Sequence, residues 1–117
     1  MPTLNEEDIY LYKARITSVY DGDTVTADVD LGFGIWAHGE KLRLNRINTP
    51  EVRGPEREQG LISRDWLREK LMGKMILLQT VKDKKGKYGR YLAEIHLDGV
   101  NINDQLVTEG LAEYKSY

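Results

Sequence analysis

The stretch that decides the fold is residues 24–31, TVTADVDL, which follows the turn Asp21-Gly22-Asp23. Apolar residues occupy every second position of this stretch and alternate with threonine and aspartate. Such a period of two is typical of a β-strand that is buried on one face. Asp-Gly is a strong turn signal, and residues 9–20 before it are rich in Tyr, Ile and Val. The sequence therefore predicts a β-hairpin at this point of the chain.

The segments that follow repeat the strand signal and then change to a helix signal. Residues 40–47 predict a third strand, which residues 48–50 end because proline cannot donate to a strand ladder. Residues 56–72 predict a helix, since apolar residues recur there at i and i+4 and a glycine follows as a C-terminal stop. Residues 74–82 and 88–97 predict two further strands, with a polar turn between them.

The C-terminal part completes the expected fold. Asn101 or Asn103 can cap a short helix that runs through Val107. Three strands, a helix, two strands and a second helix form the layout of a five-stranded OB-type barrel, a mainly β fold with helices (α+β). We expect residues 1–8 to be a flexible N-terminal tail and residues 9–117 to form a single domain of ordinary size.

Composition narrows the chemistry. The chain has no cysteine, which excludes disulfides and thiolate metal sites, and its two histidines lie far apart in sequence. Any bound metal should therefore prefer oxygen ligands, as calcium, magnesium and manganese do. The net charge of −2 counts against a nucleic-acid partner, although lysines and arginines cluster locally around residues 82–90 and 43–57.

No sequence signal points to a membrane or to secretion. No apolar run approaches the length of a membrane span, so we expect no membrane partner. The acidic N-terminus lacks the basic and apolar regions of a signal peptide, from which we expect a cytoplasmic protein.

Three pieces of the chain carry side chains suited to phosphate chemistry. The two carboxylates of Asp21-Gly22-Asp23 can present oxygens to one hard cation, although Asp-Gly is also a plain hairpin turn. Arg43 can clamp a phosphate and Glu51 can position a water, but either residue can equally be a solvated surface group. Residues 87–90, Lys-Tyr-Gly-Arg, form either a phosphate-binding edge or a solvated hairpin tip.

Taken together and in order, these pieces resemble the staphylococcal nuclease (thermonuclease) family from about Tyr12 to Tyr114. The matching blocks are Asp21-Gly22-Asp23-Thr24-Val25, Arg43-Leu44, Thr49-Pro50-Glu51, Lys87-Tyr88-Gly89-Arg90 and residues 103–111 with the closing Gly110-Leu111-Ala112. Five ordered blocks make this match far more specific than any single block.

The resemblance implies a function and a set of site residues. It implies an OB-fold nuclease that hydrolyses phosphodiester bonds of DNA and RNA with calcium as its cofactor, and we expect it to act as a monomer. The implied catalytic residues are Arg43, Glu51 and Arg90; the implied substrate-binding residues are Lys87 and Tyr88; the implied calcium ligands are Asp23, Asn48 and the backbone carbonyl of Thr49, with Asp21 close by.

The chain also departs from the family pattern. Asn48 stands where the pattern has a second calcium-binding aspartate, so we expect weaker calcium binding. Residues 31–40 lengthen the second hairpin, and the short stretch 52–54 shortens the loop before the helix. These departures leave an alternative function open, namely a catalytically weak or inactive module that binds nucleic acid or a protein partner.

Overall fold

The computed structural model describes residues 10–85 and 90–116. The predicted tail, residues 1–8, lies outside the described residues. The long strands are β1 (Leu11–Asp21), β2 (Thr24–Gly32), β3 (Ile35–Leu44), β5 (Met75–Lys85) and β6 (Tyr91–Leu97). The helices are α1 (Arg57–Leu71), α2 (Ile102–Thr108) and the 3-10 turn η2 (Gly54–Glu56), and the short strands are β4 (Ile47–Asn48), β7 (Val100–Asn101) and β8 (Glu113–Tyr114).

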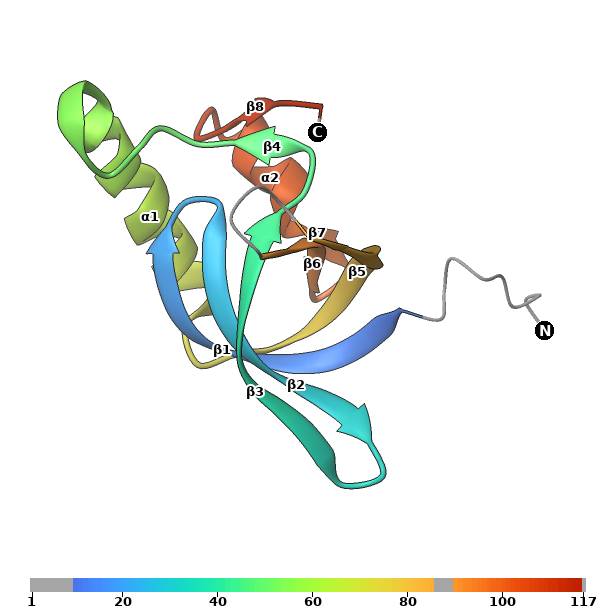
Figure 1. Cartoon of the computed structure of the whole chain (residues 1–117). Helices are drawn as coiled ribbons and strands as arrows, with labels where there is room; N and C mark the ends of the chain where they lie inside the picture. The colour runs from blue at the N-terminus through green and yellow to red at the C-terminus, as the bar shows by residue number, and fades with distance from the viewer. Residues whose placement is uncertain (1–9, 86–89, 117) are drawn as a thin grey trace.

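The long strands form a closed barrel (Figure 1). Their order is β3-β2-β1-β5-β6, with antiparallel neighbours, and the ring closes where β3 pairs in parallel with β6. The predicted five-stranded OB-type barrel is confirmed, with one helix between the third and fourth long strands and another after the fifth.

The alternation that predicted β2 sets the inside of the barrel. Val25, Ala27 and Val29 are buried in one core with Leu42 and Leu44 of β3. The same core takes in side chains from β1, β5, β6 and both helices. Each buried aliphatic side chain contributes roughly 1.5–3 kcal/mol to folding relative to an exposed one, so the core holds the strand ends in fixed places.

The third predicted strand differs most from the structure. It begins earlier, at Ile35, and ends at Leu44 instead of continuing to Ile47. Arg46 adopts φ 68°, a left-handed conformation that breaks the strand. The chain then resumes as β4, which pairs with β8 in a separate two-stranded sheet.

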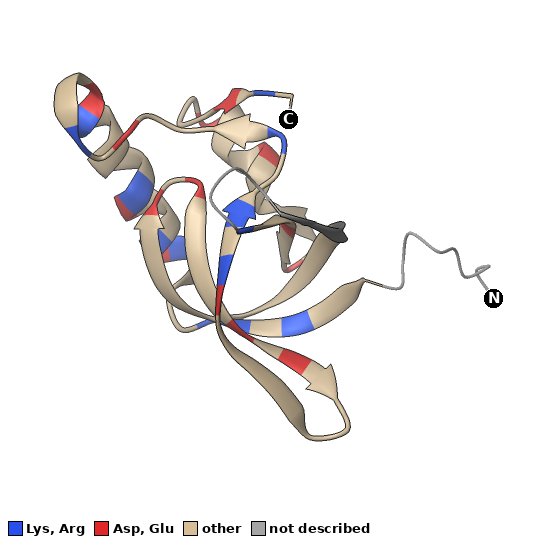
Figure 2. Cartoon of the chain, in the orientation of Figure 1, with Lys and Arg blue, Asp and Glu red and all other residues tan. Residues whose placement is uncertain are grey.

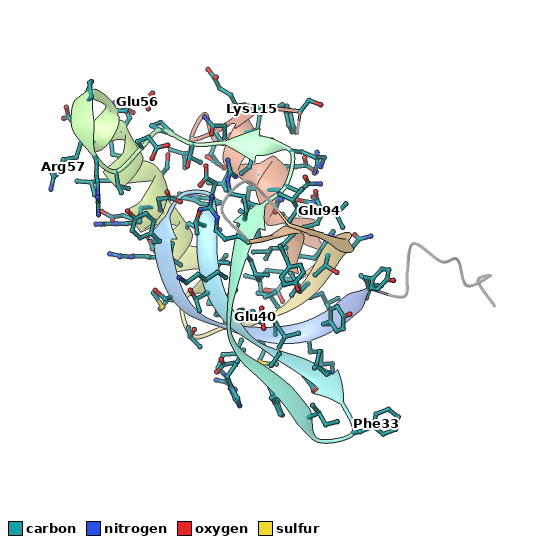
Figure 3. The ribbon with its side chains drawn as sticks, viewed as in Figure 1. Phe33, Glu40, Glu56, Arg57, Glu94 and Lys115 are labelled. Atoms are coloured by element: carbon teal, nitrogen blue, oxygen red, sulfur yellow. The ribbon has the colours of Figure 1, made fainter. Side chains whose placement is uncertain are left out.

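The structure also tests the predicted long hairpin and the predicted cap of the C-terminal helix. The extended hairpin over residues 31–40 is present as β2 and β3, with Phe33 fully exposed at its tip (Figure 3). Asn101 is the cap of α2, since its side-chain oxygen accepts from the amide of Asp104 at 3.0 Å. Asn103 instead lies fully buried and joins Asn45 to β6. Within the described part of the chain, no helix is long and apolar enough to cross a bilayer.

Candidate functional site

The turn between β1 and β2 contains two buried carboxyl groups. Asp21 is 7% exposed and Asp23 is 6% exposed, and the amide of Asp23 donates to Asp21 Oδ1 at 3.0 Å. Gly22 makes this possible, because a Cβ at that position would lie 2.8 Å from the Thr49 methyl carbon and 2.9 Å from Ser63 Cβ. The Asp-Gly-Asp sequence thus lets the turn pack directly against α1 and the segment after β4.

Asp23 is the centre of the site. Its Oδ2 atom accepts from the amide of Thr49 at 3.0 Å and forms an ion pair with Arg43 Nη2 at 3.2 Å. Its Oδ1 atom accepts from the hydroxyl of Thr24 at 3.2 Å. One carboxylate therefore connects the β1–β2 turn, the end of β3 and the segment that follows β4.

Arg43 is buried at the end of β3, with 8% of its surface exposed. Its neighbour Leu42 belongs to the barrel core, so strand alternation turns Arg43 to the other side of the barrel wall. Nη1 donates to the carbonyl oxygens of Leu44 (2.9 Å) and Ile47 (3.1 Å), and Nη2 donates to Asn48 Oδ1 (3.3 Å). The corner between β3 and β4 therefore wraps around the guanidinium group.

Arg90 reaches the same cluster from the position just before β6. Its Nη1 atom donates to the hydroxyl oxygen of Thr24 at 3.1 Å, and Thr24 in turn donates to Asp23. Figure 2 shows acidic residues at the β1–β2 turn close to basic residues at the end of β3. Lys87 and Tyr88, the predicted substrate-binding residues, lie outside the described residues.

Glu51 lies apart from this bonded cluster. It follows Thr49 and Pro50 along the chain, and its side chain is exposed. Within the described ranges, no hydrogen bond or ion pair joins its carboxylate to Asp23, Arg43 or Arg90. Its backbone, in contrast, is held by the residue just before α1, because its amide donates to Glu56 Oε1 at 3.3 Å.

The two buried carboxyl groups affect each other. Burial, together with the hydrogen bond and charge of Asp23, raises the pKa of Asp21 from 3.8 to about 7. A bound cation would relieve the repulsion between these two groups. The oxygens of Asp21, Asp23, Asn48 and the Thr49 carbonyl are the hard donors that calcium prefers. The residues present therefore fit a calcium ion of modest ligand charge, although residues 10–85 and 90–116 contain no group of three or more acidic or histidine side chains arranged to hold a metal.

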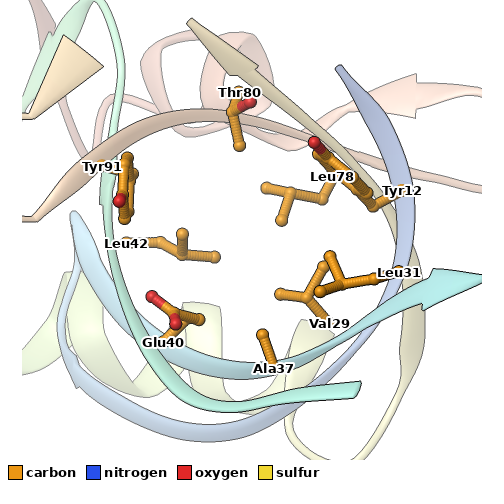
Figure 4. Close-up of a pocket in the computed structure, with 9 residues that line it drawn as sticks. All are labelled: Tyr12, Val29, Leu31, Ala37, Glu40, Leu42, Leu78, Thr80 and Tyr91. Atoms are coloured by element: carbon orange, nitrogen blue, oxygen red, sulfur yellow. The ribbon is translucent and has the colours of Figure 1, made fainter. Parts of the chain in front are cut away.

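One cavity adjoins the cluster, and another lies inside the barrel. A polar cavity of about 180 Å³ adjoins it between β4, α1 and the C-terminal segment, and Asn48, Thr49, Glu56 and Glu113 are among its lining residues. A more apolar pocket of about 150 Å³ opens at the end of the barrel, where Leu42 and Leu78 point toward its centre from opposite walls (Figure 4). The barrel pocket lies on the interior side of the β3 wall, away from Arg43.

Sequence reasoning gave no role in the site to several residues that position its parts. Thr24 links Arg90 to Asp23, but a threonine in a strand carries no special signal. Gly22 and Gly60 allow close packing, and Gly60 could have been noticed because glycine is unfavourable inside a helix. Glu56 could not have been singled out, because its role depends on the path of the chain around it.

Comparison with known proteins gives consistent matches. The family model described as staphylococcal nuclease homologue matches residues 41–117. A thermonuclease of Staphylococcus hyicus is 31% identical over 106 residues, which are 88% of this chain and 59% of the relative. A thermonuclease of Staphylococcus intermedius is 31% identical over 87% of this chain and 59% of its own length. An uncharacterised protein of Bacillus anthracis is 28% identical over 84% of this chain and 45% of its own length. The chain thus spans about three fifths of the thermonucleases that it matches.

Proposed function

The chain belongs to the family of staphylococcal nuclease homologues, and we propose on this basis that it hydrolyses phosphodiester bonds of DNA and RNA with the help of calcium. The observation that supports this proposal most is the connection of Arg43 and Arg90 through Asp23 and Thr24. Two arginines from distant parts of the sequence thereby share one small region of the structure with oxygen atoms that could hold a cation.

In this proposal the two arginines act on the phosphate. Arg43 and Arg90 would neutralise the negative charge that builds on the phosphoryl oxygens in the transition state. Asp23 and its bonded neighbours hold Arg43 in place, so its position does not depend on the substrate. Lys87 and Tyr88 would contact a neighbouring phosphate of the substrate.

Glu51 would supply the base. As an exposed carboxylate, Glu51 could orient a water molecule or accept its proton during in-line attack on phosphorus. Asp23, Asn48 and the Thr49 carbonyl, with Asp21 beside them, would hold calcium, which supplies positive charge to the scissile phosphate when bound.

A digestion assay tests the proposal. Plasmid DNA, single-stranded DNA and RNA are incubated with the protein in calcium, in magnesium or with a chelator. We expect cleavage in calcium that the chelator abolishes, and a loss of about 10²-fold or more in Glu51→Gln and Arg90→Ala. Wild-type turnover in either variant, with its fold intact by circular dichroism, would contradict the assigned roles.

A second candidate function is a nucleic-acid-binding module with little or no hydrolytic activity. The observation that favours it is Asn48, whose amide oxygen brings no charge to the cation and already accepts from Arg43. Such a module would bind DNA or RNA with an affinity that falls steeply as salt rises, yet leave the strands uncut. The digestion assay and a salt-dependent binding assay together distinguish the two functions.

A further inference from the structure

Helix α1 contains a buried glycine, Gly60, where glycine is disfavoured. Inside a helix, glycine costs roughly 0.5–1 kcal/mol relative to alanine, so its presence needs a local reason. The reason is the close approach of another backbone segment: a Cβ at Gly60 would overlap the carbonyl group of Glu51 and lie 2.8 Å from the amide nitrogen of Val52. The atoms in the way are backbone atoms, which cannot turn aside as a side chain can.

The backbone of Glu51 makes a second contact, with Glu56. Glu56 precedes α1, and its Oε1 atom accepts from the Glu51 amide at 3.3 Å. Figure 3 shows Glu56 and Arg57 at the end of α1 where the helix begins. The carbonyl group of Glu51 thus lies against Gly60 of α1 and its amide bonds to Glu56 just before the helix, whereas the residue itself is exposed.

We propose that Gly60 and Glu56 are positioning residues for Glu51. They dock the Glu51 backbone onto α1, and this docking sets the direction in which the carboxylate points toward the phosphate site. Only residues 52 and 53 separate Glu51 from η2, so the helix rather than a long loop fixes the base. The inference rests on the role assigned to Glu51 in the proposed function.

The test compares turnover with binding. Gly60→Ala should push the Glu51–Val52 segment away from α1 and lower kcat by about 10²-fold, because a displacement near 1 Å costs about that much in a positioned reaction. Glu56→Ala should lower kcat by a smaller factor, about tenfold, since the Gly60 contact remains. Glu56→Gln keeps an oxygen acceptor for the Glu51 amide and should restore most of the lost rate. We expect KM, and calcium affinity by calorimetry, to stay within about twofold in all three variants.

Two controls separate positioning from general damage to the helix. Glu58→Ala removes the same kind of side chain from the first turn of α1 without touching Glu51, and we expect wild-type kcat. In a Glu51→Gln background, Gly60→Ala should cause no further loss of kcat, because it acts through the missing carboxylate. If Gly60→Ala does not fold, Glu56→Ala and Glu56→Gln carry the test by themselves.

The outcomes are distinct. Wild-type kcat in folded Gly60→Ala and Glu56→Ala, together with an inactive Glu51→Gln, would overturn the positioning inference and leave the proposed function standing. Equal losses in the wild-type and Glu51→Gln backgrounds would overturn it as well. Full turnover in Glu51→Gln would instead remove the role of Glu51, and the inference would fall with it.

Discussion

Arg43 and Arg46 are three residues apart, yet the regions around them differ in charge balance. Arg46 forms a two-pronged contact with Glu94, at 2.9 and 2.8 Å, and an ion pair with Asp104 at 2.9 Å. Around Arg43, a second cation, Arg90, reaches the carboxylate of Asp23 through the hydroxyl of Thr24. The other carboxyl group of this cluster, Asp21, has a raised pKa because it is buried, which favours its neutral form.

The Arg46 cluster holds separate parts of the fold together, whereas the Arg43 region is a candidate phosphate site. One guanidinium faces two carboxylates at Arg46, so that cluster is negative overall and repels a phosphate. The hydrogen bonding that Arg46 donates to Glu94 is the largest of the effects that raise the pKa of Arg46 above its ordinary value. The cluster also holds the C-terminal segment, since Lys115 donates its amide to the Arg46 carbonyl at 2.7 Å and Tyr114 lies against the guanidinium. Of the two regions, the Arg43 region is the one that brings two arginines together, so it is the better candidate for binding a phosphate.

The largest expected effect tests this contrast directly. Arg43→Ala should lower kcat/KM for DNA by about 10³-fold, because it removes a donor aimed at the charge of the transition state. Arg46→Ala should leave kcat/KM within a few-fold of wild type. Steady-state assays of both variants, with folding checked by circular dichroism, decide the point. Arg43→Lys, which keeps the charge but loses the planar fork, should remain strongly impaired. Similar losses in the alanine variants of both arginines would erase the distinction.

Arg46→Ala should lower the stability of the protein, although it should leave its activity nearly unchanged. Its replacement by alanine leaves Glu94, whose side chain is only 12% exposed, without its cation. We expect a loss of about 1–3 kcal/mol in the free energy of unfolding, measured with urea. Arg64→Ala is the matched control, because Arg64 pairs with the exposed Asp65 and such surface pairs contribute about 0–1 kcal/mol. If Arg46→Ala has the same free energy of unfolding as Arg64→Ala, the Arg46 cluster does not stabilise the fold.

The sequence predicted the barrel well because the barrel depends on local patterns. The alternation in residues 24–31 and the i, i+4 spacing of Leu67 and Leu71 are visible in the chain and follow directly from burial on one face. The site was harder to predict, because its contacts join residues far apart in sequence. The bond between Arg90 and Thr24 and the docking of Glu51 on Gly60 depend on how strands and helix meet. The resemblance singled out Arg43, but the contacts that separate it from Arg46 depend in the same way on how distant segments meet.

The protonation of Asp21 gives a pH-dependent test of the Arg43 region. Its pKa rises from 3.8 to about 7 on folding, so between these values the native state holds a proton that the unfolded chain releases. Its contribution to stability therefore falls as pH rises from about 4 to 7. Asp21→Asn should be near neutral at pH 4 and stabilise the protein by about 1–3 kcal/mol at pH 8 without calcium. Asp30→Asn, on the β2–β3 hairpin, is the control. A pH-independent effect of Asp21→Asn would contradict this account.

Adding a charge to the same region should have a smaller effect. Asn48→Asp places a carboxylate beside Arg43 and among the proposed calcium ligands, so calcium binding should tighten severalfold, about 1 kcal/mol. Calorimetry with calcium measures the change. Glu113→Gln alters a residue that pairs with Asn48 across the β4–β8 ladder and should leave calcium affinity unchanged. No gain in affinity, or a loss, would argue that Asn48 is no calcium ligand.

The smallest expected effect concerns Thr49, the residue after β4. Its hydroxyl oxygen is buried and has no hydrogen-bond partner in the described part of the chain, whereas its methyl group packs near Gly22. Thr49→Val keeps the shape and the backbone amide that donates to Asp23, so the free energy of unfolding should change by less than about 1 kcal/mol, or rise. Thr24→Val is the matched change at a hydroxyl bonded to both Asp23 and Arg90, and it should destabilise the protein and lower kcat. Equal effects of the two valines would show that the bonds of Thr24 do not organise the Arg43 region.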